Sequence, residues 1–135
     1  MRLIAIDPGA SAGVAVFADG KLVEVRRVKV DATRPVPLGL FADELVIEMP
    51  MVYPTSGNPA SIVKLAFVAG KLAEAIGAPK TRLVTPREWK GQRPKEIDQH
   101  LTVSLLDIGE RGRLTVRNSD VLDAVGLGLW ALGRR

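Results

Sequence analysis

Four carboxylates occupy positions in the sequence that would suit a divalent cation. Asp7 and Glu48 each end a short apolar run, RLIAID and ELVIE, while Asp120 and Asp123 are three residues apart. Carboxylates that converge raise one another's pKa values unless a cation lies among them. Oxygen ligands suit Mg²⁺ or Mn²⁺, and two such ions about 4 Å apart can stabilise the attacking and leaving oxygens of phosphodiester hydrolysis. The pattern therefore predicts a metal site capable of phosphodiester chemistry.

Each of these acids also has an ordinary structural explanation. Asp7 is followed by Pro8 and Gly9, a good β-turn sequence. An acid in the first turn of a helix, such as Asp120, stabilises that helix through its dipole. Glu48 is harder to explain, because a buried carboxylate without a partner costs several kcal/mol. The functional interpretation thus depends on all the acids meeting. With one His and no Cys in the chain, a zinc site has little support.

The elements that must position the acids can be predicted from apolar patterning. Three strands form a meander, with Asp19-Gly20 as a two-residue hairpin turn between the second and third. Two further short apolar runs follow a proline-rich connection. If the first and fourth strands are parallel neighbours, Asp7 and Glu48 emerge at one sheet edge, where ligands of α/β proteins usually bind. The predicted strands cover 2–7, 13–18, 21–30, 44–50 and 81–84.

Four helices complete the expected α/β fold, a mixed five-stranded sheet with helices on both faces. A capping box at Thr85 and Glu88 predicts a short helix. Three longer helices are expected over 60–76, over 94–108 with Gly109 as its stop, and over 119–132 with Ser119 as its cap. We expect residues 50–59, which are rich in proline, to form an exposed loop.

Composition favours a single domain, 1–135, with a polyanionic partner. The chain has 135 residues, no Cys and a formal net charge of +4. No apolar run reaches the roughly 20 residues of a membrane span, and no secretory signal is evident, so we expect a cytoplasmic protein without a membrane partner. A basic segment that suits contact with a polyanionic backbone contains Arg87, Lys90, Arg93 and Lys95. Trp89, within this segment, could belong to the contact surface or pack in the core.

The motifs around the acids resemble those of the RuvC family of Holliday-junction resolvases, which have an RNase H-like fold. The resemblance spans nearly the whole chain. It is carried by IDPGASAG at 6–13, LVIEMP at 45–50, NPASIVKLAFVAGKL at 58–72 and SDVLDAVGLGLWAL at 119–132. Each motif alone is weak evidence, but all four occur in the family's order.

The resemblance implies that Asp7, Glu48, Asp120 and Asp123 are catalytic acids that bind two Mg²⁺ ions, with Mn²⁺ able to replace Mg²⁺ and no small-molecule cofactor. It also implies a homodimer that makes symmetric nicks in a four-way DNA junction. Small residues of the 60–76 helix would form the dimer interface, or they would pack only on the chain's own sheet; they are Ala66, Ala69, Gly70 and Ala73.

Two departures from the family pattern affect these expectations. The family often has an aromatic residue three positions after its Glu, where this chain has Met51, so Tyr53 is the nearest candidate for stacking on junction bases. Lys64 and the basic segment of Arg87, Lys90, Arg93 and Lys95 are then expected to contact DNA. The connection over 31–44 and the whole chain are short, which favours a phage-type member that acts in a host cell over a bacterial one. Three alternatives stay open: an RNA-processing nuclease of the YqgF type, an actin- or sugar-kinase-like ATP-binding domain, and a non-catalytic branched-DNA-binding module.

Overall fold

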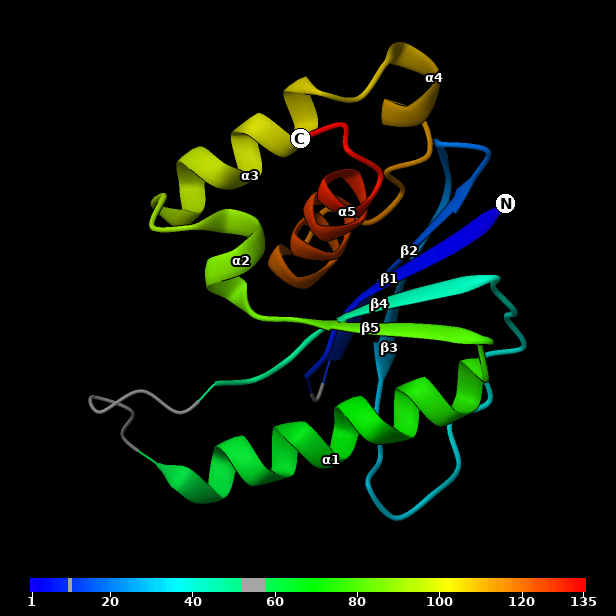
Figure 1. Ribbon diagram of the computed structural model, residues 1–135, viewed down its shortest axis with the longest axis vertical. Coiled ribbons are helices and arrows are strands. Elements are labelled where there is room, and N and C mark those ends of the chain that lie inside the picture. Colours follow the sequence, from blue (N-terminus) through cyan, green and yellow to red (C-terminus); the bar gives the residue numbers. More distant parts are fainter. Residues whose placement is uncertain (10, 52–57) are drawn as a thin grey trace.

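The protein is a five-stranded sheet with helices on both faces (Figure 1). The computed structural model describes residues 1–9, 11–51 and 58–135. The strand order is β3-β2-β1-β4-β5, which confirms the mixed sheet expected from the sequence. The strands are β1 (Arg2–Asp7), β2 (Ser11–Ala18), β3 (Lys21–Lys29), β4 (Glu44–Glu48) and β5 (Lys80–Val84).

The first three strands form the predicted antiparallel meander, and β4 and β5 add to it in parallel. Asp19 and Gly20, between β2 and β3, have φ values of 49° and 81°, as a type I′ hairpin turn requires. β1 and β4 are adjacent and parallel, and their last recorded pair is Ile6 with Ile47. The next residue of each strand is an acid, so Asp7 and Glu48 leave the sheet at the same edge.

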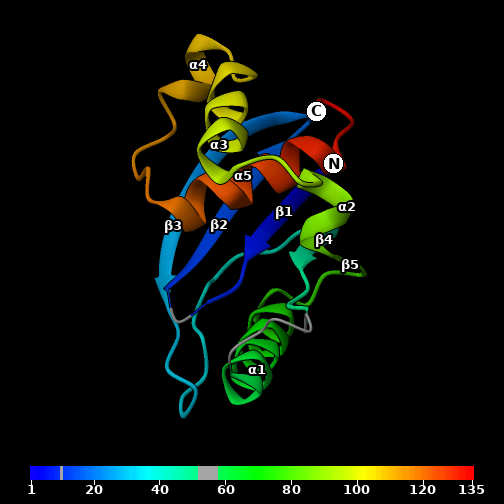
Figure 2. The same ribbon diagram turned by 90° about the vertical axis from the view of Figure 1, so that its left-hand side faces the viewer.

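Helices cover the two faces of this sheet (Figure 2). Of the described helices, none is both long and apolar enough to cross a bilayer. α1 lies on one face, while α5 lies on the other with α2 to α4 around it. The helices are α1 (Pro59–Ile76), α2 (Pro86–Lys90), α3 (Lys95–Ser104), α4 (Ile108–Arg111) and α5 (Ser119–Ala131).

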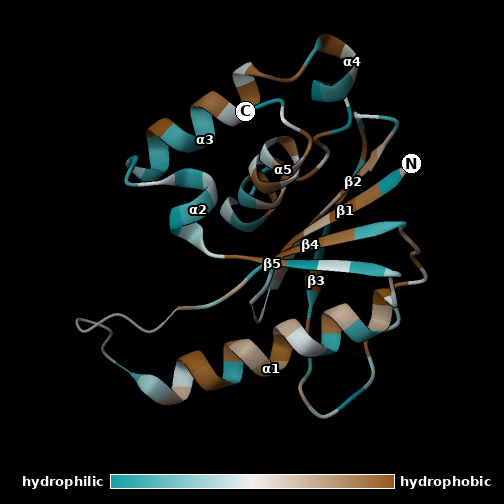
Figure 3. Cartoon of the chain, in the orientation of Figure 1, coloured by the Kyte–Doolittle hydropathy of each residue, from teal (hydrophilic) through white to brown (hydrophobic). Residues whose placement is uncertain are grey.

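Both faces of the central strands are buried, which explains their nearly continuous apolar sequences (Figure 3). Along β1, side chains alternate between two hydrophobic clusters. Ile4 and Ile6 pack in the cluster that includes α1, whereas Leu3 and Ala5 pack in the cluster that includes α5. An acid at the end of such a strand is therefore held by a rigid framework.

The prediction of one helix over 94–108 was wrong. α3 ends at Ser104, and a second capping box, formed by Asp107 and Glu110, begins α4. Gly109 lies inside α4 rather than ending a helix. The apolar pattern also selected the wrong face, because Ile97 and Ile108 are exposed.

Polar residues form the buried face of α3 instead. Asp98 and Thr102 are each 1% exposed, and the side chain of the C-terminal Arg135 reaches them. Arg135 pairs with the Asp98 carboxylate, and its Nη1 donates to Thr102 Oγ1 at 2.8 Å. The apolar pattern of one helix does not indicate that a charged residue is buried when its partner lies far along the chain.

Smaller differences concern the ends of elements. The residue that caps α5 is Asn118, and Ser119 is the first residue of the helix. Ser119 Oγ accepts a hydrogen bond from Gln99 Nε2 at 3.0 Å. The strand predicted over 13–18 begins at residue 11, and the strand predicted over 44–50 ends at residue 48. The capping box of Thr85 and Glu88 is present, as predicted.

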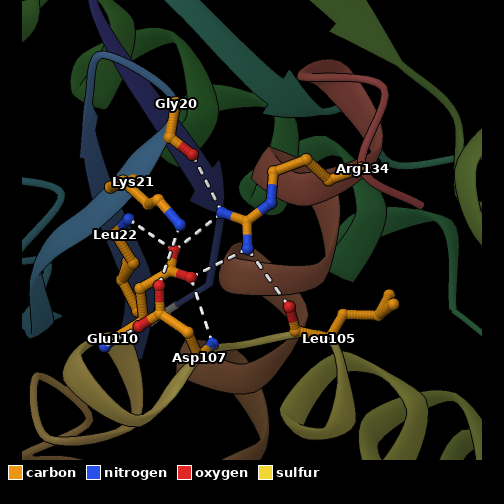
Figure 4. Close-up of polar contacts among 7 residues, drawn as sticks. All are labelled: Gly20, Lys21, Leu22, Leu105, Asp107, Glu110 and Arg134. Carbon is orange, nitrogen blue, oxygen red and sulfur yellow. Dashed lines mark hydrogen bonds and ion pairs between the residues drawn. The ribbon is translucent and has the colours of Figure 1, made fainter.

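The C-terminus is anchored by Arg134 (Figure 4). Its guanidinium forms two bonds with Glu110, from Nη1 to Oε2 at 2.7 Å and from Nη2 to Oε1 at 2.8 Å. Arg134 also donates to the carbonyl oxygens of Gly20 and Leu105. The backbone N–H of Leu22 donates to Glu110 as well. This network ties the chain end and α4 to the β2–β3 hairpin.

Candidate active site

Asp7 and Glu48 form one half of the site, at the carboxyl ends of β1 and β4. Asp7 is only 8% exposed, although it ends its strand. It lies directly opposite Gly13 in the antiparallel ladder between β1 and β2. The parallel pairing of β1 with β4 places Glu48 beside it, as the sequence predicted.

Asp120 and Asp123 form the other half, and Gly13 explains how they reach the strand ends. The backbone of α5 passes so near Gly13 that a Cβ there would lie 2.0 Å from the Asp120 carbonyl oxygen. Only glycine permits this approach, which sets the first turn of α5 against the residue paired with Asp7. Asp123 is buried and Asp120 is partly exposed.

The charges of the other three acids act on Asp7. Burial, and then the charges of Glu48, Asp123 and Asp120, raise the pKa of Asp7 to about 9, while Lys90 opposes this rise. Burial also raises the pKa of Glu48, and a hydrogen bond from Trp89 opposes that rise. The mutual effect expected of converging carboxylates is therefore present.

The chemistry of these donors fits a hard divalent cation. All four are carboxylates, the ligand type that Mg²⁺ and Mn²⁺ prefer, and their like charges would be relieved by a cation between them. Within the described parts of the chain, no three acidic or histidine side chains are already arranged around a common point. The side chains that would hold an ion are carried by strands and a helix that are already in place.

Three neutral or basic side chains contact the acids. Trp89 Nε1 donates to Glu48 Oε2 at 2.8 Å, Gln99 Nε2 donates to Asp123 Oδ1 at 3.3 Å, and Lys90 Nζ lies 3.9 Å from Asp123 Oδ2. Trp89 is 2% exposed, so it packs in the core and does not form part of an exposed contact surface. Sequence reasoning missed Gln99, since no local pattern links α3 to α5.

The other predicted DNA-contact residues are more dispersed. Arg87 is exposed on α2 and Lys95 is exposed at the start of α3, where its charge lowers the pKa of Glu48. Arg93 pairs with Asp98 at 3.6 Å. Lys64 is exposed on α1, on the opposite face of the sheet from α2. Tyr53 lies outside the described residues. Among the predicted contact residues that the structure describes, Lys90 is the one paired with an acid of the candidate site.

Comparisons with known proteins identify the fold. No family model and no curated protein sequence matches the chain. Among solved structures, it is similar to Thermus thermophilus RuvC in complex with Holliday junction substrate, at a TM-score of 0.66 and 18% identity, over 98% of this chain and 94% of that one. It is also similar to Thermus thermophilus RuvC alone, at a TM-score of 0.58 and 19% identity, again over 98% and 94%.

A viral structure has the same fold. This is the Fowlpox virus resolvase in complex with substrate Holliday junction DNA, at a TM-score of 0.56 and 14% identity, over 98% of this chain and 97% of that one. The RuvC-type, RNase H-like fold implied by the sequence motifs is therefore confirmed along nearly the full length of the chain.

Proposed function

We propose that this protein is a metal-dependent endonuclease that resolves four-way DNA junctions by paired, symmetric nicks. The observation that supports the proposal is that Asp7 ends a strand at the same sheet edge as Glu48, opposite the first turn of α5, where the charges of Glu48, Asp120 and Asp123 all act on it. The fold supports it, because the similar structures include two resolvases in complex with Holliday junctions.

The acids have a simple role in this reaction. Asp7, Glu48, Asp120 and Asp123 would hold Mg²⁺, with two ions per site and with Mn²⁺ able to replace Mg²⁺. When bound, such ions polarise the scissile phosphate and lower the pKa of the attacking water. The chain itself supplies rigidity, since Asp7 and Glu48 end buried strands and Asp123 lies on a buried helix face. Lys90 places a positive charge beside Asp123.

Binding of the junction would use the basic side chains around this edge. Arg87 on α2 and Lys95 on α3 are exposed, and the charge of Lys95 acts on Glu48. Lys64 is exposed on α1, across the sheet from them. Lys90 and Arg93, which already pair with acids, would contribute charge more than direct contacts. Tyr53 would stack on junction bases. Binding of this kind weakens as salt concentration rises, because counterions are released from DNA.

A homodimer suits the two-fold symmetry of a four-way junction. The outer face of α1 supports such a dimer. Val63 and Phe67 are exposed there. Beside them, Ala66 and Gly70 line an apolar groove of about 270 Å³ that Leu83 of the edge strand β5 closes. Ala69 packs on the sheet, whereas Ala66 and Gly70 are exposed and would be available to a partner copy.

A nicking assay tests the proposed activity. A labelled synthetic four-way junction is incubated with the protein in Mg²⁺, in Mn²⁺ and in EDTA. We expect paired symmetric nicks in either metal and none in EDTA. Asp7→Asn and Glu48→Gln should abolish nicking and retain junction binding. Glu44→Gln is a matched control at the opposite end of β4, where Glu44 pairs with Lys80 at 3.7 Å, and it should cut normally.

The same assay separates the alternatives. Binding without cutting in either metal would support a non-catalytic branched-DNA-binding module. Cutting of structured RNA in preference to the junction would support an RNA-processing nuclease of the YqgF type. Failure on both nucleic acids, together with ATP binding by calorimetry, would support a nucleotide-binding domain. Each result would contradict the proposed junction resolution.

A further inference from the structure

The indole of Trp89 is bonded to an acid of the candidate site. Its Nε1 donates to Glu48 Oε2 at 2.8 Å, and the two residues are 41 positions apart. Buried tryptophans usually bond a polar partner, and here that partner is a carboxylate that the proposed reaction needs. A hydrogen bond to an ionised oxygen is roughly twice as strong as one between neutral groups. The bond therefore fixes one oxygen of Glu48.

The Trp89 ring is itself held on several sides. Gly126 of α5 makes room for it, since a Cβ at Gly126 would lie 2.9 Å from Trp89 Cζ3. The Arg135 guanidinium lies 5.1 Å from the ring centroid, as does the Lys90 ammonium. Arg135 is in turn fixed by Asp98 and Thr102 of α3. The orientation of the indole N–H is thus determined by α2, α3, α5 and the chain end together.

We propose that Trp89 is a positioning residue for Glu48. Its N–H holds Oε2 and leaves the second carboxylate oxygen available to the divalent cation. This inference rests on the proposed function, because it assigns Glu48 to the metal. Groups that orient metal ligands commonly change metal affinity or activity by about 10- to 100-fold when they are altered.

The test removes the indole N–H of Trp89 and keeps an aromatic ring at this position. Trp89→Phe loses the donor, and replacement of Trp89 by benzothienylalanine loses it with almost no change in shape. Trp130→Phe is the matched control, because Trp130 is partly exposed at the far end of α5 and stacks with Arg82. Two readouts are compared: the Mg²⁺ concentration that half-saturates the thermal stabilisation of the DNA-free protein, and the concentration that half-saturates junction nicking.

We expect both Mg²⁺ midpoints to rise about 10- to 100-fold in the two Trp89 variants. Both should stay at the parental value in Trp130→Phe, and nicking should largely recover at saturating Mg²⁺. A purely structural role for Trp89 would lower the melting temperature without moving either midpoint. Parental midpoints in the folded benzothienylalanine variant would therefore overturn the inference, even if Trp89→Phe folds poorly.

The measurements on the parent protein distinguish a wrong function from a wrong role for Trp89. If the parent protein shows neither Mg²⁺ stabilisation nor nicking, the proposed function is wrong and this inference with it. If the parent binds Mg²⁺ and cuts, but its Trp89 variants match it, only the positioning role is wrong.

Discussion

Gly13 on β2 is in such close contact with Asp120 on α5 that a Cβ at Gly13 would lie 2.0 Å from the Asp120 carbonyl oxygen. Gly13 also pairs directly with Asp7 across the ladder. A residue without a side chain thus sets the separation between the acids of the sheet and the acids of the helix. The candidate site depends on this backbone approach as much as on the carboxylates themselves.

Gly13→Ala should therefore damage the site more than the fold. The added methyl meets backbone atoms, so α5 must move, at a cost of about 1–3 kcal/mol or more. A displacement of about 1 Å at the acids can lower the rate of nicking roughly 100-fold. Nicking per folded molecule and the melting temperature measure the two effects.

Gly128→Ala provides the control for that experiment. It introduces the same methyl in the same helix, but against the Phe17 side chain, 2.1 Å from its Cε2. We expect Gly128→Ala to lose stability while nicking per folded molecule changes little. Equal losses of activity in both variants would show that Gly13 has no special role in placing the acids.

Asp7→Asn should stabilise the protein in EDTA while it abolishes nicking. The pKa of Asp7 is raised to about 9, so at neutral pH the folded state holds a proton that the unfolded state has released. This difference lowers the free energy of unfolding, and increasingly so as the pH rises from about 5 to about 8. One unit of pKa shift corresponds to about 1.4 kcal/mol, so we expect a gain of at least about 1 kcal/mol.

Melting curves of the parent and of Asp7→Asn in EDTA, recorded across that pH range, measure the gain. The stability gap between them should widen with increasing pH. A gap that is constant with pH would mean that Asp7 ionises in the folded protein as freely as in the unfolded chain.

The Arg134–Glu110 pair should make the protein sensitive to acid. Arg134, the largest cause, lowers the pKa of Glu110 below its ordinary value of 4.5. The pair stabilises the folded state fully above the pKa that Glu110 has in the unfolded chain. This stabilisation is lost as the pH falls through the lower pKa of Glu110 in the folded protein. We expect Arg134→Met to cost about 2–4 kcal/mol at neutral pH, somewhat below the roughly 3–5 of a fully buried pair.

Urea unfolding of the parent, Arg134→Met, Glu110→Gln and the double variant measures the coupling. The difference between parent and Glu110→Gln should shrink as the pH is lowered below about 4. If the four proteins show additive effects, the pair is not coupled and the acid sensitivity arises elsewhere.

Arg87→Ala should weaken junction binding and lessen its dependence on salt. Arg87 is exposed on α2, the helix whose Trp89 bonds Glu48. Loss of one phosphate contact should reduce the slope of log K against log salt by about 1. Fluorescence anisotropy with a labelled junction at several salt concentrations measures the slope. Lys80→Ala, at the other end of β5, is the matched control and should leave the slope unchanged.

Phe67→Glu should convert the expected dimer to a monomer. Phe67 is 56% exposed on α1, where a charge would oppose burial between two copies. Phe41→Glu is the control, because Phe41 is 70% exposed but lies just before β4 and stacks with Arg2. Light scattering gives the mass of each variant. A dimer that survives Phe67→Glu would place the interface on another surface.

The sequence by itself determined the parts of this protein that depend on local pattern. Apolar runs predict all five strands, Asp19-Gly20 predicts the hairpin turn, and the capping box at Thr85 predicts α2. The four acids could be selected because strand ends and helix spacing are visible in sequence. The prediction of one helix over 94–108 was wrong because the apolar residues Ile97 and Ile108 face outward while Asp98 faces inward.

Only the tertiary structure decided how these parts meet. The close approach of Gly13 to Asp120, the bond from Trp89 to Glu48 and the burial of Arg135 against Asp98 each join residues far apart in the chain. Contacts of this kind leave no periodicity in the sequence, because they depend on how the sheet twists and where its helices lie. The chemical identity of the site is therefore local in origin, and its geometry is a property of the whole fold.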